Sequence, residues 1–187
     1  MVYFCIDVEA SGQVAPFYNL LSIGASVLHK KNDRYVIGDA FYVELCPIFP
    51  GFDPAALEVC GLDVNRLRQE GVEPGLAMRQ LTDFVRAQNE GSSKGPVFVG
   101  HNAVFDWAYI AYYYEHFKLE NPFGYKAIET KSLAMGRLGI PWLDTSKERL
   151  AKTLNLPALD PAQLHRADYD AWYQALIFKA LIEKQPA

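Results

Sequence analysis

The sequence predicts one α/β domain with a mixed sheet, and three features of the chain carry this prediction. Three apolar, strand-like segments follow one another closely at residues 2–8, 19–30 and 34–45. Strand-like and helix-like segments then alternate. The 187 residues suit one domain, and half of them are hydrophobic, which is enough to bury a sizeable core. A chain that begins with strands and then alternates strands with helices favours an α/β domain.

The first three segments favour antiparallel strands. Residues 2–8 are nearly all apolar up to Asp7, as expected of a buried strand. Only a polar turn at residues 30–33 separates the second segment from the third. Three strands in such quick succession predict an antiparallel meander.

Proline positions and hydrophobic spacing predict the helices. Pro54 favours the start of a short helix that stops at Gly61. Pro74 precedes a longer helix in which apolar residues recur at approximately helical spacing. Residues 96–100 are expected to form a short strand that runs into a helix from about Val104. Three further helices are expected: residues 126–138, 146–154 and 166–183.

Charge and cysteine content exclude several classes of protein. The net charge of −4 argues against a protein that holds nucleic acid by a basic surface alone, but not against a nuclease whose carboxylates hold cations. No apolar run approaches the roughly 20 residues of a transmembrane helix, and the N-terminus lacks a signal-peptide pattern. Cys5, Cys46 and Cys60 form no CxxC pair, so neither a zinc site nor a disulfide framework is expected. A reducing, cytoplasmic location fits best.

Asp7 and Glu9 form the first acidic pair, at the end of the first predicted strand. Side chains of a strand alternate between faces, so both carboxylates point the same way and repel each other. A bound divalent cation would remove this repulsion, and oxygen ligands suit magnesium or manganese. Two solvated carboxylates at a strand end are the alternative interpretation.

Two later segments add further acidic residues. GHNAVFD places Asp106 where a strand passes into a helix, with its side chain expected to point toward the sheet; an acidic residue that complements the helix dipole is the alternative. HRADYDA contains His165 and Asp170, which converge only if His165 lies before a helix and Asp170 on its first turns. A capping or core histidine is the alternative there.

The order of these motifs, DxE, HNxxFD and HxAxxD, resembles the DEDDh exonucleases from about Tyr3 to Leu181. This superfamily contains ribonuclease T, oligoribonuclease and the proofreading exonuclease subunit of bacterial replicative polymerase. The resemblance implies a ribonuclease-H-like fold, with a mixed five-stranded sheet flanked by helices, and 3′-5′ exonuclease activity. The stretches DVEASG, LLSIGA, HNAVFD and LHRADYDA are more similar to ribonuclease T than to oligoribonuclease. Ser22 stands where such relatives carry Glu, at a position that is not a metal ligand in the family.

The resemblance also implies two magnesium ions, for which manganese would substitute. Asp7 would bridge them, Glu9 and Asp170 would complete one site, and Asp106 would act on the second metal. His165 would be the general base. General chemistry supports these roles, because two metals activate water and stabilise the leaving oxygen during phosphodiester hydrolysis. A histidine with a pKa near neutrality can take the proton of the water.

Recognition of the strand end is expected in the segment after the first acidic pair. In relatives this backbone contacts the terminal sugar, and it corresponds here to Ala10, Ser11 and Gly12. Gly12 is small enough for a nucleotide to approach, unless it is a plain turn glycine. Phe17 and Tyr18 are the aromatic residues expected to stack on terminal bases. The likeness to ribonuclease T favours RNA or short oligonucleotides over DNA.

The expected partner is single-stranded nucleic acid or a 3′ overhang, with no membrane. A homodimer is a further expectation, because several relatives dimerise to complete their substrate site. Two alternatives are a proofreading-type subunit that binds a polymerase and a nucleic-acid-binding module without catalysis. Proofreading subunits carry an additional tail, and few residues follow the last predicted helix, which disfavours the first. The intact set of four acidic residues and a histidine disfavours the second.

Overall fold

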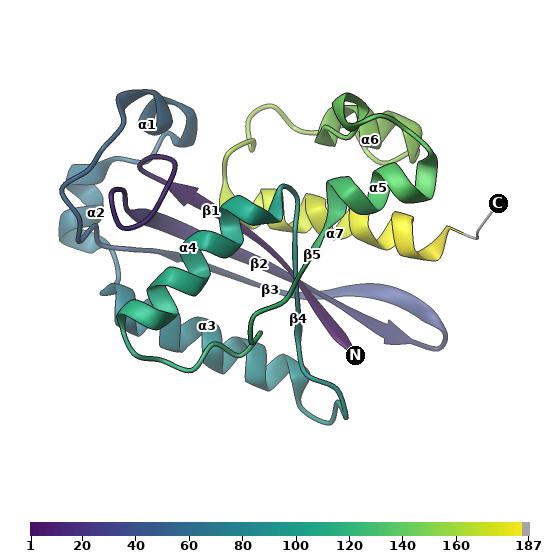
Figure 1. The fold of residues 1–187 in the computed structure, drawn as a ribbon, viewed down its shortest axis with the longest axis horizontal. Coiled ribbons are helices and arrows are strands. Elements are labelled where there is room, and N and C mark those ends of the chain that lie inside the picture. Colours follow the sequence, from purple (N-terminus) through teal and green to yellow (C-terminus); the bar gives the residue numbers. More distant parts are fainter. Residues whose placement is uncertain (185–187) are drawn as a thin grey trace.

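The computed structural model describes residues 1–184 and contains a five-stranded mixed sheet flanked by helices (Figure 1). The strand order is β3-β2-β1-β4-β5, so the first strand lies at the centre. The strands are β1 (Val2–Ala10), β2 (Leu20–Lys31), β3 (Arg34–Glu44), β4 (Val97–Gly100) and β5 (Ala127–Glu129). The prediction of an α/β fold with a mixed five-stranded sheet is confirmed.

The antiparallel half of the sheet is the predicted meander. β1 pairs antiparallel with β2, and β2 pairs antiparallel with β3. Asn32 and Asp33 form the turn between β2 and β3 with φ angles of 48° and 61°. Asn and Asp tolerate this left-handed region, and two such residues match the twist of a tight hairpin.

The parallel half of the sheet corrects one prediction. β4 pairs parallel with β1, and β5 pairs parallel with β4. β5 lies within residues 126–138, which the local pattern predicted as one helix. Only α5 (Thr130–Leu138) is helical there, and the Glu129 carboxylate caps it by accepting from the backbone N–H groups of Lys131 and Ser132. The strand exists because it pairs with β4, a contact that no local spacing reveals.

Most of the other helices agree with the predicted segments. The short α2 and a 3-10 turn at Trp142–Asp144 were not predicted. α2 begins where Asp63 accepts hydrogen bonds from the backbone N–H groups of Asn65 and Arg66, which is an N-cap. The helices besides α5 are α1 (Pro54–Cys60), α2 (Val64–Glu70), α3 (Pro74–Asn89), α4 (Ala103–His116), α6 (Lys147–Thr153) and α7 (Ala167–Glu183).

The two faces of the sheet are covered by different helices. Phe4 and Val8 of β1 belong to the largest buried cluster, together with residues of α3 and α4. Cys5, which points to the opposite face, packs against Phe178 of α7. A separate buried cluster joins α5, α6 and α7, which Figure 1 shows side by side. This cluster fixes the position of α6 relative to the start of α7.

None of the helices among residues 1–184 has the length and apolar character that a membrane span requires.

Candidate active site

The acidic residues of the three motifs meet in one open cleft beside the carboxyl ends of β1 and β4. The cleft has a volume of about 450 Å³. β1 and β4 are parallel neighbours, so their carboxyl ends lie at the same edge of the sheet, where ligand sites of α/β folds form. Its lining includes every residue of the predicted catalytic set: Asp7, Glu9, Asp106, His165 and Asp170. The fold therefore brings together residues that are far apart in the sequence.

Asp7 and Glu9 reach this cleft because side chains of β1 alternate between the two faces of the sheet. Cys5, two residues earlier, packs in the cluster on the α7 side. Val8 points the other way, into the core beneath α3 and α4. Both carboxylates therefore lie on the face that α7 covers, where Asp170 also lies.

Gly24 allows α7 to begin directly beside Asp7. Gly24 is the partner of Asp7 in the pairing of β1 with β2. A Cβ atom at Gly24 would lie 2.0 Å from the backbone oxygen of Ala167, the first residue of α7. A glycine is needed because the helix backbone contacts the strand at this point. This close approach brings Asp170, in the first turn of α7, next to the end of β1.

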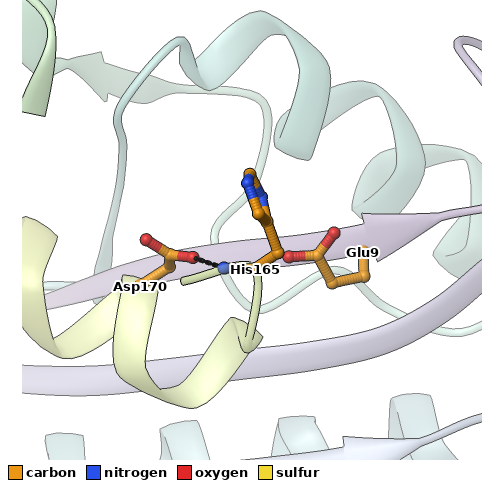
Figure 2. A group of neighbouring side chains, drawn as sticks. All are labelled: Glu9, His165 and Asp170. Carbon is orange, nitrogen blue, oxygen red and sulfur yellow. Dashed lines mark hydrogen bonds between the residues drawn. The ribbon is translucent and has the colours of Figure 1, made fainter. Parts of the chain in front are cut away.

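His165 and Asp170 converge as their spacing required. His165 lies before α7 with a φ of 61°, and its backbone N–H donates to Asp170 Oδ2 at 2.9 Å. Figure 2 shows this bond, with Glu9 on the neighbouring strand. One ligand atom each of Glu9, His165 and Asp170 lies within 4.8 Å of the others. The left-handed backbone at His165 turns the chain so that it faces the acidic cluster before the helix starts.

Asp106 enters the cleft from the first turn of α4. Its Oδ1 accepts the backbone N–H of Val8 at 3.0 Å, so the carboxylate points toward the end of β1 as predicted. The preceding Asn102 has a φ of 69°, which turns the chain sharply between β4 and α4. Burial, together with the nearby charge of Asp7, raises the pKa of Asp106.

Several negative charges in one half-buried cleft are electrostatically unfavourable. Burial raises the pKa of Asp7 to about 6, although Lys147 counteracts this. Burial, followed by the charges of Asp7 and Asp170, raises the pKa of Glu9 to about 9. Ionisation of Asp7 and Glu9 in the folded protein therefore costs free energy, and a bound cation would offset this cost.

The donor set fits hard divalent cations. Carboxylate oxygens dominate it, and a single imidazole is the only nitrogen ligand in the cluster formed by Glu9, His165 and Asp170. Magnesium and manganese prefer oxygen ligands, whereas structural zinc sites use cysteine and histidine. Asp7, Glu9, Asp106 and Asp170 are the residues that would hold such ions.

Lys147 is a cleft residue that sequence reasoning missed. It is the first residue of α6, and its Nζ lies 2.6 Å from Asp170 Oδ1 and 3.4 Å from Asp7 Oδ1. Burial alone would lower its pKa, but the charges of Asp7 and Asp170 raise it instead. Its position in the sequence could have drawn attention to it, because a lysine at the start of a helix interacts unfavourably with the helix dipole. Such a lysine needs negative partners from elsewhere in the fold.

Gln174 is the second residue that was missed. It lies one helical turn after Asp170 in α7 and is fully buried. Its Nε2 donates to Asp7 Oδ1 at 2.5 Å, and its Oε1 accepts the backbone N–H of His101 at 3.1 Å. The amide thus ties β1 to the chain after β4. The signal was a polar residue inside the apolar stripe of the last helix.

Within residues 1–184, the residues predicted to bind substrate are not among those that line the cleft. They are Ala10, Ser11, Gly12, Phe17 and Tyr18. Ser11 is buried and donates its hydroxyl to the backbone oxygen of Gly51. A Cβ atom at Gly12 would lie 2.2 Å from the Tyr18 ring, so packing explains this glycine. Phe17 is 72% exposed, and its contact with bases stays a prediction.

Phe105 contacts both the core and the cleft. Its ring packs edge-on against Tyr109 at a centroid distance of 5.3 Å, and it also lines the cleft.

The comparisons with known proteins agree with this geometry. No family model matches the chain. It is 36% identical over 183 residues to the 3′-5′ DNA exonuclease Cap18 of Escherichia coli, covering 98% of this chain and 92% of the relative. It is 30% identical over 188 residues to ribonuclease T of Pectobacterium atrosepticum, covering 96% and 80%.

The fold is also similar to a solved nuclease domain. The nuclease domain of 3′hExo, a DEDDh family member bound to rAMP, matches with a TM-score of 0.82 at 13% identity. The match covers 99% of this chain and 93% of that domain. Both kinds of likeness extend over nearly the whole chain, and so they include every segment that lines the cleft.

Proposed function

Because the chain belongs to the DEDDh 3′-5′ exonucleases, it is a phosphodiester hydrolase, and we propose that it works with two divalent cations held in the cleft. Magnesium is the proposed ion and manganese its substitute. The single observation that supports this most is that the predicted catalytic residues, which come from three distant segments, all line one cleft: Asp7, Glu9, Asp106, His165 and Asp170. Bringing two dications together requires about this number of carboxylates.

Each residue of the cleft has a proposed role. Asp7 lies centrally and would contact both cations, Glu9 and Asp170 would complete one site, and Asp106 would serve the second. When bound, the cations supply the positive charge that activates water and stabilises the leaving oxygen. His165 would accept the proton of the attacking water, because a neutral imidazole is a suitable base near pH 7.

The oxygen atoms are held in place by the protein itself. Gln174 orients Asp7, the backbone N–H of Val8 orients Asp106, and that of His165 orients Asp170. Such pre-organisation lowers the cost of assembling the reacting groups. It supports catalysis as the function and disfavours a module that only binds nucleic acid.

DNA is the substrate with the better support, and RNA is the second candidate. The relative with 36% identity is named as a DNA exonuclease, whereas the motif similarity to ribonuclease T favours RNA or short oligonucleotides. The distinction rests on contacts to the 2′-hydroxyl. Digestion of matched 5′-labelled single strands of DNA and RNA, and of duplexes with 3′ overhangs, would rank them by kcat/KM.

The carboxylate assignment is tested by a matched pair of variants in one motif. We expect Asp170→Ala to abolish magnesium-dependent cleavage of a 5′-labelled oligonucleotide, because Asp170 lines the cleft. Asp168→Ala should cleave at nearly the wild-type rate, because Asp168 pairs with Arg166 and is outside the cleft lining. Asp7→Ala should match Asp170→Ala while keeping the fold. Normal cleavage by either cleft variant would contradict the assignment.

A cytoplasmic location and a homodimer complete the proposal. The free cysteines Cys5, Cys46 and Cys60 support a reducing location. The homodimer rests on the family resemblance, in which a second copy completes the substrate site. Sedimentation at micromolar concentration tests it, and a monomer at that concentration would remove this part of the proposal.

A further inference from the structure

A half-buried ammonium group lies among the carboxylates of the cleft. The side chain of Lys147 is 18% exposed and makes ion pairs with Asp170 and Asp7 at 2.6 and 3.4 Å. The side chains of these two carboxylates are 5% and 14% exposed. Ion pairs this well buried are screened little by solvent, so the ammonium contributes strongly to the charge balance of the cleft.

The position of Lys147 is determined by the fold and not by local preference. α6 packs with α5 and α7 through buried residues that include Leu150 and Ala151. Ser146 caps the helix by accepting the backbone N–H of Arg149, so Lys147 is held as its first residue. A positive charge is unfavourable at that end of a helix. The attraction of Asp7 and Asp170 must therefore outweigh the helix dipole.

The contacts of Lys147 coincide with the oxygens that we assign to metal binding. Asp170 Oδ2 already accepts the backbone N–H of His165, so Oδ1, which Lys147 contacts, is its oxygen without a backbone donor. Asp7 Oδ1 accepts from both Gln174 and Lys147. Lys147 Nζ lies 2.6 Å from Asp170 Oδ1, so a dication bound at this oxygen would lie close to the ammonium. The two positive charges would repel each other strongly at low effective dielectric. A cation bound at these oxygens therefore weakens the binding of the other cation.

We propose that Lys147 is a tethered cation that competes with divalent metal ions for Asp7 and Asp170, and that turns to a phosphate of the substrate when they bind. The proposal rests on the proposed function. Lysine suits both roles, because its ammonium is a compact charge on a flexible four-carbon stem. Lys147 also lines the cleft that the substrate phosphate would enter, together with Ser146 and Lys131. Metal loading and phosphate binding would thereby be coupled through one side chain.

Competition predicts a result opposite to that of a structural role. If Lys147 only held the carboxylates in place, its removal would weaken metal binding. If it competes, its removal frees the oxygens, so the affinity for metal rises. Lys147→Met keeps most of the apolar stem without the charge. Lys152→Met is the matched control, because Lys152 is exposed on the same helix.

The test is calorimetric titration of EDTA-treated, dialysed protein with Mn²⁺, without substrate. We expect Lys147→Met to bind Mn²⁺ about tenfold more tightly than wild type, which is the effect of losing a charged hydrogen bond. Lys152→Met should bind as wild type does, and Lys147→Arg, which keeps the charge, should restore weaker binding. Equal or weaker Mn²⁺ binding by Lys147→Met would overturn the competition.

A second measurement tests the contact with phosphate. At saturating Mn²⁺, Lys147→Met should bind a phosphorothioate-linked deoxythymidine oligonucleotide about tenfold more weakly, and Lys147→Arg should recover part of the loss. Unchanged oligonucleotide affinity would overturn this half of the proposal. If Lys147→Met does not fold, Lys147→Gln replaces it in both titrations.

The outcomes separate this inference from the proposed function. A wild-type protein that neither binds Mn²⁺ nor cleaves would contradict the proposed function and this inference with it. A wild-type protein that binds and cleaves, beside a Lys147→Met variant with no gain in metal affinity, would contradict the inference alone.

Discussion

Asp7 is the cleft carboxylate that several different elements contact. Gln174 donates to it from α7 and Lys147 from α6, while Gly24 lies opposite it in the sheet. Glu9 and His165 lie further out, toward the start of α7.

His165 is expected to serve proton transfer and not metal binding. Its replacement in His165→Ala should lower kcat by about two to four powers of ten, as expected for loss of a general base. Calorimetric titration with Mn²⁺ should give nearly wild-type affinity. One atom of His165 lies within 4.8 Å of the Glu9 and Asp170 ligand atoms, so a ligand role is the competing interpretation. A large loss of Mn²⁺ affinity would support that interpretation.

Glu9 is expected to give the protein a stability that falls with rising pH in the presence of EDTA. Its pKa rises from 4.5 to about 9 on folding, mainly through burial. Across this window the native state binds a proton that the unfolded chain has released, so the free energy of unfolding decreases as pH increases. The slope contributed by one such group is at most about 1.4 kcal/mol per pH unit.

Urea denaturation at about pH 5.5 and about pH 8 measures this effect. Glu9→Gln carries no titratable proton, so its stability should depend less on pH than that of wild type. Glu58→Gln, on the exposed side of α1, is the control and should keep the wild-type dependence. Identical slopes for wild type and Glu9→Gln would contradict the assignment of this proton to Glu9.

Among the elements, α7 contributes most to the site. Its first turn carries Asp170, the next turn carries Gln174, and the segment before it carries His165. The helix can serve all three because it starts directly on β2, with its backbone against Gly24. The position of one helix end thus controls the spacing of the carboxylates.

Gly24→Ala is expected to displace the start of α7. The added Cβ would lie 2.0 Å from the backbone oxygen of Ala167, which cannot move independently of the helix. We expect a loss of about 1–3 kcal/mol in stability, typical of overpacking, and a lower kcat. Gly38→Ala on β3 is the control, because its Cβ would meet side chains and no backbone: His29 at 3.1 Å and Val27 at 3.9 Å. Equal activity and stability of the two variants would contradict this prediction, because α7 would then accommodate a Cβ atom at position 24.

For the molecule as a whole, net charge and substrate charge have the same sign. The chain carries −4 and would bind a polyanion. Several of the carboxylates that contribute to this charge lie together in the cleft. Divalent cations, together with Lys147 and Lys131 in the cleft lining, are the positive charges available there. Strand binding should therefore depend on metal more than on a basic surface.

Removal of divalent cations is expected to weaken binding of the strand itself. The affinity for a phosphorothioate-linked oligonucleotide, measured by fluorescence anisotropy, should fall at least about tenfold from magnesium to EDTA. Binding that stays equal in EDTA, but falls steeply with sodium chloride, would instead indicate a basic surface that holds the strand.

The sequence by itself determined the class of fold, the meander and the catalytic candidates. Alternation along β1 placed Asp7 and Glu9 on one face, and the spacing of His165 and Asp170 required a turn before α7. These features depend on local geometry, which repeats with a fixed period in a strand or helix. The directly readable part of the site is therefore the set of residues that project from predictable elements.

Only the tertiary structure decided which other groups enter the cleft. β5 forms by pairing with β4, and Lys147 is positioned by the packing of α6 against α7. Gln174 reaches Asp7 from α7, which covers that face of the sheet. Phe105 lines the cleft as well as the core. Each of these positions results from contacts between segments distant in the chain, which no local pattern encodes. The carboxylates could be identified from the sequence. Lys147 and Gln174 stood out there only as polar residues at unfavourable helix positions, and their contacts with Asp7 came from the tertiary structure.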